Sequence, residues 1–256
     1  GDDRIDIVLV LTPPDARRAV IEPLTWAGKA ILLEKPVGRT LEEAREVVTL
    51  CEAAQAPLGV VFQHRMREAS VAARDLVTGG ALGALGLAEI AVPWWREQAY
   101  YDEPGRGTYA RDGGGVLISQ AIHTIDLALS MTGPVSTVTA MTGTTPLHAM
   151  EAEDMAVAGL RFGNGALGWL TASTASFRGA AESITLHFEK ASLRLAKGVL
   201  RVDWRDGRTE TRGAMAKTGG GADPMAFTHD WHAAVLEDFA TAVMSGRPPA
   251  ITGRDA

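Results

Sequence analysis

The first quarter of the chain alternates apolar segments with helical ones, and this alternation restricts the fold more than any other feature. Apolar, β-rich runs at residues 5–11, 29–33 and 58–62 predict three buried strands. Residues 13–27 and 40–54 between them predict helices. Because each connection is short, strand, helix, strand, helix, strand predicts a parallel sheet, the layout of half a doubly wound domain.

The way the chain begins supports this interpretation. Gly1 stands where an initiator Met is expected, and the first strand starts by Ile5. A buried parallel strand needs neighbours on both sides. We therefore expect the sequence to begin in the middle of a domain.

The rest of the chain predicts an α+β unit built on a large, mostly antiparallel sheet. Helical segments are expected at residues 67–78, 119–130 and 228–245, and Gly219-Gly220-Gly221 marks a loop. Short strands follow one another with turn residues between them, as in an antiparallel meander. They are expected at residues 85–92, 135–142, 155–162, 166–174, 183–188, 192–196 and 199–204.

Composition excludes several classes of protein. The 25 Lys and Arg residues against 31 Asp and Glu residues leave a net charge of −6, which argues against binding to nucleic acid or to an anionic membrane. No apolar run reaches the length of a membrane helix. The single cysteine fits a reducing compartment. We expect a cytoplasmic location.

One glycine motif is rejected as a nucleotide site. Residues 163–168 match G-x-G-x-x-G, but a dinucleotide fingerprint needs a helix after its glycines. Here Trp169-Leu170-Thr171 follows, which is typical of a strand, so a hairpin turn is predicted. No other glycine set fits a phosphate-binding loop.

Metal and nucleophile sites are not predicted either. His229 and His232 are three positions apart, and His148 lies near Glu153 and Asp154, but no established metal-ligand spacing accompanies them. We therefore predict no metal. Cys51 lies within a predicted helix with no histidine near it in sequence, which disfavours a catalytic thiol.

The first candidate site is Glu34-Lys35-Pro36, which follows the second predicted strand. Ligands of open α/β sheets bind at the carboxyl ends of the strands. A lysine that loses solvation there has a lowered pKa and can transfer protons near neutral pH. A solvated surface ion pair is the alternative.

The second candidate is the glycine run at residues 113–115 with Ser119, His123 and Asp126 after it. Spacings of four and three place these three side chains on one helical face. The glycines allow a ligand or another backbone to approach closely. A structural role for His123 remains the alternative.

An aromatic loop supplies further candidates. Trp94-Trp95-Arg96 and Tyr100-Tyr101 lie in a predicted loop, where recognition residues are frequent; domain packing is the alternative. If a substrate carries a carboxylate, the arginines available to bind it are Arg65, Arg96 and Arg111.

Taken together, these motifs resemble the Gfo/Idh/MocA family of NAD(P)-dependent oxidoreductases. The resemblance covers nearly the whole chain and rests on the order of its motifs. They are Thr12-Pro13, Glu34-Lys35-Pro36, the triple glycine before His123-Thr124-Ile125-Asp126, Glu153-Asp154 and Arg247-Pro248. It implies that residues 1–64 are the C-terminal part of a Rossmann domain. Residues 65–256 would then form the substrate and oligomerisation domain.

The resemblance also implies chemical roles. Hydride would pass between NAD or NADP and a hydroxyl or ketone carbon of a sugar, cyclitol or cyclic diol. Lys35 and His123 would handle the hydroxyl proton, and the Lys35–Pro36 peptide bond is expected to be cis. The expected cofactor contacts are Thr12, Pro13, Glu34, Lys35 and Pro36. The expected substrate contacts are Arg65, Trp95, Arg96, Ser119, Gln120 and His123.

The chain departs from the family pattern in three ways. The glycine-rich phosphate loop is absent from the printed sequence, so we expect the sequence to be an internal piece of a longer enzyme. Ser119 stands where many members have Asp, and a hydroxyl stabilises an imidazolium less than a carboxylate does. Arg17 stands where a histidine often follows the Thr-Pro turn.

Two other functions remain open. A family-like binding or assembly module without a nucleotide site would account for the absent glycine loop. A hydrolase using His123 is disfavoured, because no nucleophile or metal set accompanies it. For the favoured enzyme we expect a carbohydrate-like small molecule as partner and a homodimer or homotetramer formed through the open sheet.

Overall fold

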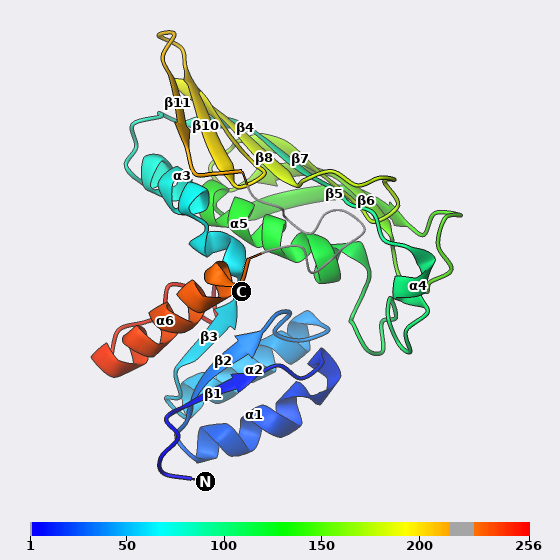
Figure 1. The fold of residues 1–256 in the computed structure, drawn as a ribbon, viewed down its shortest axis with the longest axis vertical. Coiled ribbons are helices and arrows are strands. Elements are labelled where there is room, and N and C mark those ends of the chain that lie inside the picture. The colour runs from blue at the N-terminus through cyan, green and yellow to red at the C-terminus, as the bar shows by residue number, and fades with distance from the viewer. Residues whose placement is uncertain (1, 216–227) are drawn as a thin grey trace.

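The computed structural model describes residues 2–215 and 228–256. Figure 1 shows a small sheet at the N-terminal end of the molecule and a larger sheet at the opposite end. Sheet A has three strands in the order β1-β2-β3, and sheet B has eight in the order β11-β10-β9-β8-β4-β7-β6-β5. The predicted loop at Gly219-Gly220-Gly221 lies outside the described residues.

Sheet A confirms the parallel alternation. Its strands are β1 (Ile7–Val10), β2 (Ala30–Glu34) and β3 (Leu58–Val61), and both of its strand pairs are parallel. A short helical turn, η1 (Pro14–Ala16), leads into α1 (Arg17–Trp26), and α2 (Leu41–Ala53) connects β2 to β3. Ile31, Leu33 and Val60 are fully buried, as expected for strands covered on both faces.

The start of α2 uses only half of a capping box. Thr40 Oγ1 accepts a hydrogen bond from the Glu43 backbone N–H at 3.2 Å. The Glu43 carboxylate bonds to the backbone N–H of Arg39 instead of that of Thr40, at 2.8 Å. The same carboxylate forms an ion pair with the Arg39 guanidinium. The Glu43 carboxylate therefore bonds to the N–H one residue before the N-cap, whereas a complete capping box would use the N–H of the N-cap itself.

Sheet B is mixed but mostly antiparallel, and one detail of the prediction is wrong. Strand β4 (Leu85–Pro93) lies between β7 and β8, antiparallel to β8 but parallel to β7, so the strands do not form one uninterrupted meander. The β4–β7 contact depends on Gly168, where a Cβ would lie 2.4 Å from the Ala88 carbonyl oxygen. The remaining strands are β5 (Val135–Gly143), β6 (Met155–Phe162), β7 (Leu167–Ser173), β8 (Ser183–Phe188), β9 (Ala191–Ala196), β10 (Val199–Trp204) and β11 (Thr209–Arg212).

The rejected glycine motif is indeed a hairpin turn. Residues 163–166 join β6 to the antiparallel β7, and Phe162 and Ala166 close the turn with a backbone hydrogen bond of 2.9 Å. Gly165 has a φ of +90°, which glycine adopts without strain.

Helices cover one face of sheet B and leave part of the other open. In Figure 1, α3 (Glu68–Thr78) and α5 (Ile122–Thr132) lie against the same face. Strands β5 to β7 expose apolar side chains that share the opposite face through their cross-strand register. These side chains are Met141, Val157, Leu167 and Trp169. Short helical turns η2 (Gln63–Met66) and α4 (Gln98–Tyr101) complete the connections.

The end of the chain returns to sheet A. Helix α6 (Asp230–Ser245) packs Phe239 against β3, where a Cβ on Gly59 would lie 2.5 Å from the Phe239 ring. The Val60 N–H donates to the Ile251 carbonyl oxygen at 3.2 Å. The prediction placed this segment with residues 65–256, whereas its packing partner is the first sheet. None of the described helices combines the length and apolar character that a bilayer crossing requires.

Candidate active site

Lys35 connects the end of β2 to the segment before α5. It follows β2, and its Nζ donates a hydrogen bond of 2.7 Å to the carbonyl oxygen of Ser119, 84 positions away. Burial lowers the pKa of Lys35, while the neighbouring Glu34 carboxylate raises it. The Lys35–Pro36 peptide bond is cis, as expected from the resemblance. Lys35 is half-buried and bonded to a backbone carbonyl oxygen, an arrangement that differs from a solvated surface ion pair.

Arg17 holds the backbone on either side of this lysine. Its Nε donates to the Thr12 carbonyl oxygen and its Nη2 to the Lys35 carbonyl oxygen, each at 3.1 Å. The side chain is 2% exposed, and burial lowers its pKa to about 10. Arg17 thus ties the carboxyl ends of β1 and β2 together, a role that its sequence position did not indicate.

Lys35 lines a cleft of about 860 Å³, counting the part open to solvent. Six of the predicted site residues meet in it, namely Thr12, Pro13, Glu34, Lys35, Pro36 and Ser119. Its other wall comes from the loop before the glycine run, through Tyr100, Arg106, Arg111 and Asp112. Arg106 and Asp112 were missed, and the available signal was their place just before residues 113–115. Four cationic and two acidic side chains line the cleft, which suits a polar ligand.

The glycine run allows a backbone to approach, as predicted. A Cβ on Gly115 would lie 1.8 Å from the Glu153 carbonyl oxygen, so only glycine fits there. The Glu153 carboxylate accepts hydrogen bonds from the N–H groups of Gly115 and Leu117, at 3.0 and 3.1 Å. An acid bonded to the first free N–H groups of a helix stabilises it. Glu153 therefore anchors the segment that carries Ser119.

That segment does not begin as an α-helix. Residues Leu117–Ala121 form a π-helical turn (η3), and α5 starts at Ile122. Such turns occur frequently at functional sites. The Ser119 carbonyl oxygen accepts a hydrogen bond from Lys35, whereas the Asp126 carboxylate pairs with Arg65. These two residues of the predicted common face therefore have different partners.

His123 is buried between two rings. Its imidazole lies edge-on to Phe62, with ring centroids 5.8 Å apart, and in a tilted stack with His64 at 4.9 Å. Burial, followed by the positive charges of Lys35 and Arg67, lowers its pKa well below 6.5. The ring is therefore neutral at pH 7 and able to accept a proton. His123 Nδ1 is buried and has no hydrogen-bond partner among the described residues.

Gln120 is hydrogen-bonded to Tyr100, which lines the cleft. Its Nε2 donates to Tyr100 Oη at 3.2 Å, and Arg106 Nη1 donates to the same oxygen at 2.9 Å. Gln120 Oε1 is buried without a partner in the described structure. Tyr100, one of the two tyrosines of the predicted aromatic loop, lines the cleft.

Five of the six predicted substrate contacts are not among the residues that line this cleft: Gln120 and His123, described above, and Arg65, Trp95 and Arg96. Arg65 is buried and bonds to the Asp126 carboxylate through both Nε and Nη2, so an internal partner takes the place of the expected substrate. Trp95 Nε1 donates to Glu97 Oε1 at 2.8 Å. Arg96 is 5% exposed and donates from Nη1 to the Trp95 carbonyl oxygen at 2.7 Å. Trp95 and Arg96 are thus held by the folded loop itself.

The acidic segment near His148 is structural. His148 Nδ1 lies 2.8 Å from Asp154 Oδ2, and His148 Nε2 lies 2.9 Å from the Arg96 carbonyl oxygen. Both side chains are fully buried. Within residues 2–215 and 228–256, no group of three metal-ligating side chains comes together.

Sequence profiles of one oxidoreductase family match both parts of the chain. Residues 1–62 match the profile described as the oxidoreductase family with an NAD-binding Rossmann fold. Residues 70–194 match the C-terminal domain described as GFO/IDH/MocA. Both parts of the chain therefore match one family, whose first profile is described as an oxidoreductase family with an NAD-binding Rossmann fold. The chain belongs to the Gfo/Idh/MocA family.

Individual relatives agree with this assignment. The chain is 25% identical to D-apiose dehydrogenase of Rhizobium rhizogenes over 272 positions, covering 100% of this chain and 74% of that protein. It is 30% identical to inositol 2-dehydrogenase of Rhizobium meliloti over 136 residues, covering 52% and 38% of the two chains. Several relatives match over only 38% to 50% of their own length.

A solved structure matches almost the whole chain. The WlbA dehydrogenase from Bordetella pertussis, in complex with NADH and UDP-GlcNAcA, superposes with a TM-score of 0.81 at 26% identity. The match covers 99% of this chain and 73% of that one.

Proposed function

We propose that this chain is part of an NAD(P)-dependent dehydrogenase that oxidises or reduces a hydroxyl or ketone carbon of a sugar, cyclitol or cyclic diol. The observation that carries the proposal is the hydrogen bond from Lys35 Nζ to the Ser119 carbonyl oxygen. Both residues line the same cleft as Thr12 and Pro13. Relatives named inositol 2-dehydrogenase and D-apiose dehydrogenase support this class of substrate.

The cleft fits the nicotinamide end of the cofactor. Thr12 Oγ1 and Arg17 Nη1 are both buried there without partners among the described residues. A carboxamide, with its carbonyl acceptor and N–H donors, can satisfy both atoms. Thr12, Pro13, Glu34, Lys35 and Pro36 would hold this ring. The bound nicotinamide supplies the hydride acceptor or donor.

Proton transfer falls to two residues of this chain. In the oxidation direction the neutral His123 accepts the proton of the substrate hydroxyl, which the Lys35 amine orients. Lys35 is held in place by its bond to the Ser119 carbonyl oxygen. The hydroxyl of Ser119 and the free Oε1 of Gln120 would bind further substrate hydroxyls. Because burial lowers the pKa of Lys35, its amine can exchange protons closer to pH 7 than the amine of a solvated lysine.

A binding titration tests the cofactor site. NADH and NADPH are titrated against the 256-residue chain and against the product of the complete coding sequence, with nicotinamide fluorescence as the signal. Binding to either form supports the proposal. If neither form binds NADH or NADPH, the alternative is favoured, namely a binding or assembly module without a nucleotide site.

A substitution tests the chemistry in the complete protein. Lys35→Met should lower kcat for the sugar or cyclitol by at least about 100-fold, because the group that orients the hydroxyl is lost. Lys190→Met, at an exposed position, is the matched control and should keep the parent rate. Normal turnover in Lys35→Met would refute the assignment.

We further propose a cytoplasmic homodimer or homotetramer, assembled through the open face of sheet B. Met141, Val157, Leu167 and Trp169 are each more than two-fifths exposed on that face, and a contiguous apolar surface favours association. Trp169→Glu should shift the mass measured by light scattering toward the monomer.

A further inference from the structure

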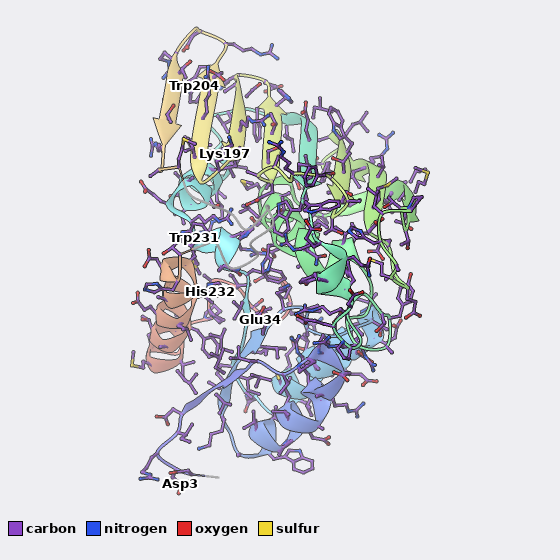
Figure 2. All side chains as sticks on the ribbon, turned by 45° about the vertical axis from the view of Figure 1, so that its right-hand side comes forward. Asp3, Glu34, Lys197, Trp204, Trp231 and His232 are labelled. Atoms are coloured by element: carbon purple, nitrogen blue, oxygen red, sulfur yellow. The ribbon has the colours of Figure 1, made fainter. Side chains whose placement is uncertain are left out.

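A second cavity lies on the His64 side of His123. The space that water can occupy in it is about 20 Å³, enough for about one molecule, and it is bounded by the η2–α3 segment, by α5, by β8 and β9, and by the turn at Lys197 and Gly198. Its polar lining includes His64, Arg67, Ser70, Thr124, Glu182 and Lys197. Figure 2 shows Lys197 and Trp231 on the same side of the molecule, and the Trp231 ring covers Arg67 at 4.3 Å.

Four residues around this cavity carry buried polar atoms without partners. These atoms are His64 Nδ1, Arg67 Nε, Thr124 Oγ1 and Glu182 Oε2, and none has a hydrogen-bond partner in the described part of the chain. All four residues are less than one-tenth exposed. Leaving one such atom unsatisfied costs about 1–3 kcal/mol. Four of them around a single cavity indicate that the cavity binds water, which can bond to several polar groups at once.

The cavity has a geometric connection to the proposed acid/base residue. His64 lines it, and the His64 ring stacks on His123 with centroids 4.9 Å apart and planes 31° apart. His123 Nδ1 is itself buried and unpartnered. Thr124, the residue directly after His123, belongs to the lining as well. One chain segment therefore touches the Lys35 cleft through Ser119 and this cavity through Thr124.

The proposed reaction creates a need for such a cavity. Oxidation of an alcohol transfers hydride to the nicotinamide and releases one proton from the hydroxyl. Cofactor and substrate together would fill the Lys35 side of the site. A proton on the buried His123 then has no short way out through that side.

We propose that this cavity is a hydrated proton pathway for His123, with His64 as the residue that positions His123 and connects it to the water. The inference rests on the proposed function. The hydroxyl O–H bond breaks and an N–H bond forms on His123. That proton then passes through water and His64 into the cavity and leaves at the exposed Lys197 side. Water must carry the proton between the rings, because a tilted stack does not aim an N–H at a nitrogen.

The surrounding charges fit a transient proton. Burial lowers the pKa of His64 most, and the charges that face it lower it further: Arg67, His123 on α5, Lys35 after β2 and His232 on α6. Glu182, the residue before β8, accepts a hydrogen bond from Arg67 Nη1 at Oε1, at 2.7 Å, and its Oε2 has no partner among the described residues. The cationic neighbours drive the proton away from the rings, and the free carboxylate oxygen stabilises it in the cavity.

Crystallography tests the hydration without any substrate. In a structure at about 1.5 Å resolution, an ordered water should bond to His64 Nδ1 and to Thr124 Oγ1 at hydrogen-bonding distance. Thr124→Val should remove that water without moving the backbone. A dry cavity in the parent protein would overturn the proposal, whatever the activity of the enzyme.

Kinetics of the complete protein test the pathway. His64→Phe keeps an aromatic ring against His123 but cannot carry a proton. It should lower kcat about tenfold, increase the solvent isotope effect on kcat and leave the NADH affinity unchanged. Thr124→Val should act in the same direction. Thr132→Val is the control, since that buried hydroxyl on α5 bonds to the Gly133 carbonyl oxygen.

The outcomes separate the two proposals. Parent-like kcat and isotope effect in His64→Phe would overturn the pathway while leaving the dehydrogenase intact, as would equal effects of Thr124→Val and Thr132→Val. If the protein binds no nicotinamide cofactor, the proposed function fails first, and an ordered water at His64 would then mark a structural hydration site, which would also overturn the pathway.

Discussion

Two buried arginine–carboxylate pairs lie close together in sequence but differ in how completely they are bonded. Arg65 bonds to both oxygens of Asp126 through Nε and Nη2. Arg67 bonds to Glu182 through a single Nη1–Oε1 contact, and its Nε and the second carboxylate oxygen remain without described partners. Burial and opposite charge are common to both pairs. The two pairs differ in how completely their polar atoms are hydrogen-bonded.

This difference indicates which of the two pairs can bind a ligand or water. The Arg65–Asp126 pair uses the main hydrogen-bonding capacity of both groups internally and leaves little for a ligand. The Arg67–Glu182 pair keeps polar atoms available beside a cavity, where unsatisfied groups persist only if something else bonds to them. An arginine in a candidate site is therefore better judged by its unused donors than by its position in sequence.

The largest effect is expected when the complete pair is broken. Arg65→Met leaves a buried, unpaired Asp126 carboxylate and should lower the free energy of unfolding by about 3–5 kcal/mol. Urea unfolding measures this. The double variant Arg65→Met/Asp126→Leu should recover most of the loss, because no buried charge remains. A single-variant cost below about 1 kcal/mol would contradict the structural role.

A smaller effect is expected at the incomplete pair. Arg67→Met removes one hydrogen bond and leaves Glu182 beside a hydrated cavity, so we expect a loss of about 1–3 kcal/mol. The same unfolding measurement applies. If Arg67→Met lowers the free energy of unfolding as much as Arg65→Met does, the two pairs contribute equally to stability and the number of hydrogen bonds does not explain their difference.

The next effect is a pH dependence of stability. Burial lowers the pKa of His64 and of His123 well below 6.5 in the folded protein, so below pH 6.5 the unfolded chain binds more protons than the folded one. Stability should therefore be full above pH 6.5 and fall as the pH decreases below it. His64→Phe removes one such site and should reduce the slope by up to about 1.4 kcal/mol per pH unit. His229→Phe, at an exposed side chain, should leave the slope unchanged.

The smallest effect is expected at the edge of the cavity. Lys197 has a φ of +54° in the tight β9–β10 turn, a conformation that glycine adopts more easily. Lys197→Gly should raise the free energy of unfolding by about 0.5–1 kcal/mol. A clear loss of stability would show instead that the lysine side chain contributes to the cavity wall.

The strands and helices were largely predictable, because hydrophobic periodicity determines them locally. Strand β6, for example, occupies the expected residues 155–162. Strand β11 was missed because Thr209–Arg212 contains only polar side chains. The position of β4 between β7 and β8 was also missed, since it depends on the pairing of Ala88 with Gly168, far apart in sequence.

Site residues at the carboxyl ends of parallel strands were predictable from sequence, whereas those whose role depends on a partner far away in the sequence were not. The carboxyl end of a parallel strand pointed to Lys35, and the same rule applied to β3 would have pointed to His64. Arg65 follows that strand as well, but Asp126 occupies its guanidinium, which no local pattern reveals. The π-helical turn at residues 117–121 likewise depends on the distant Glu153.

The return of the C-terminal segment to sheet A has a consequence for folding. The Phe239 ring packs on Gly59, and the Ile251 carbonyl oxygen accepts a hydrogen bond from the Val60 N–H. Contacts between residues so far apart in sequence are slow to form, so sheet A is completed only after the end of the chain has folded.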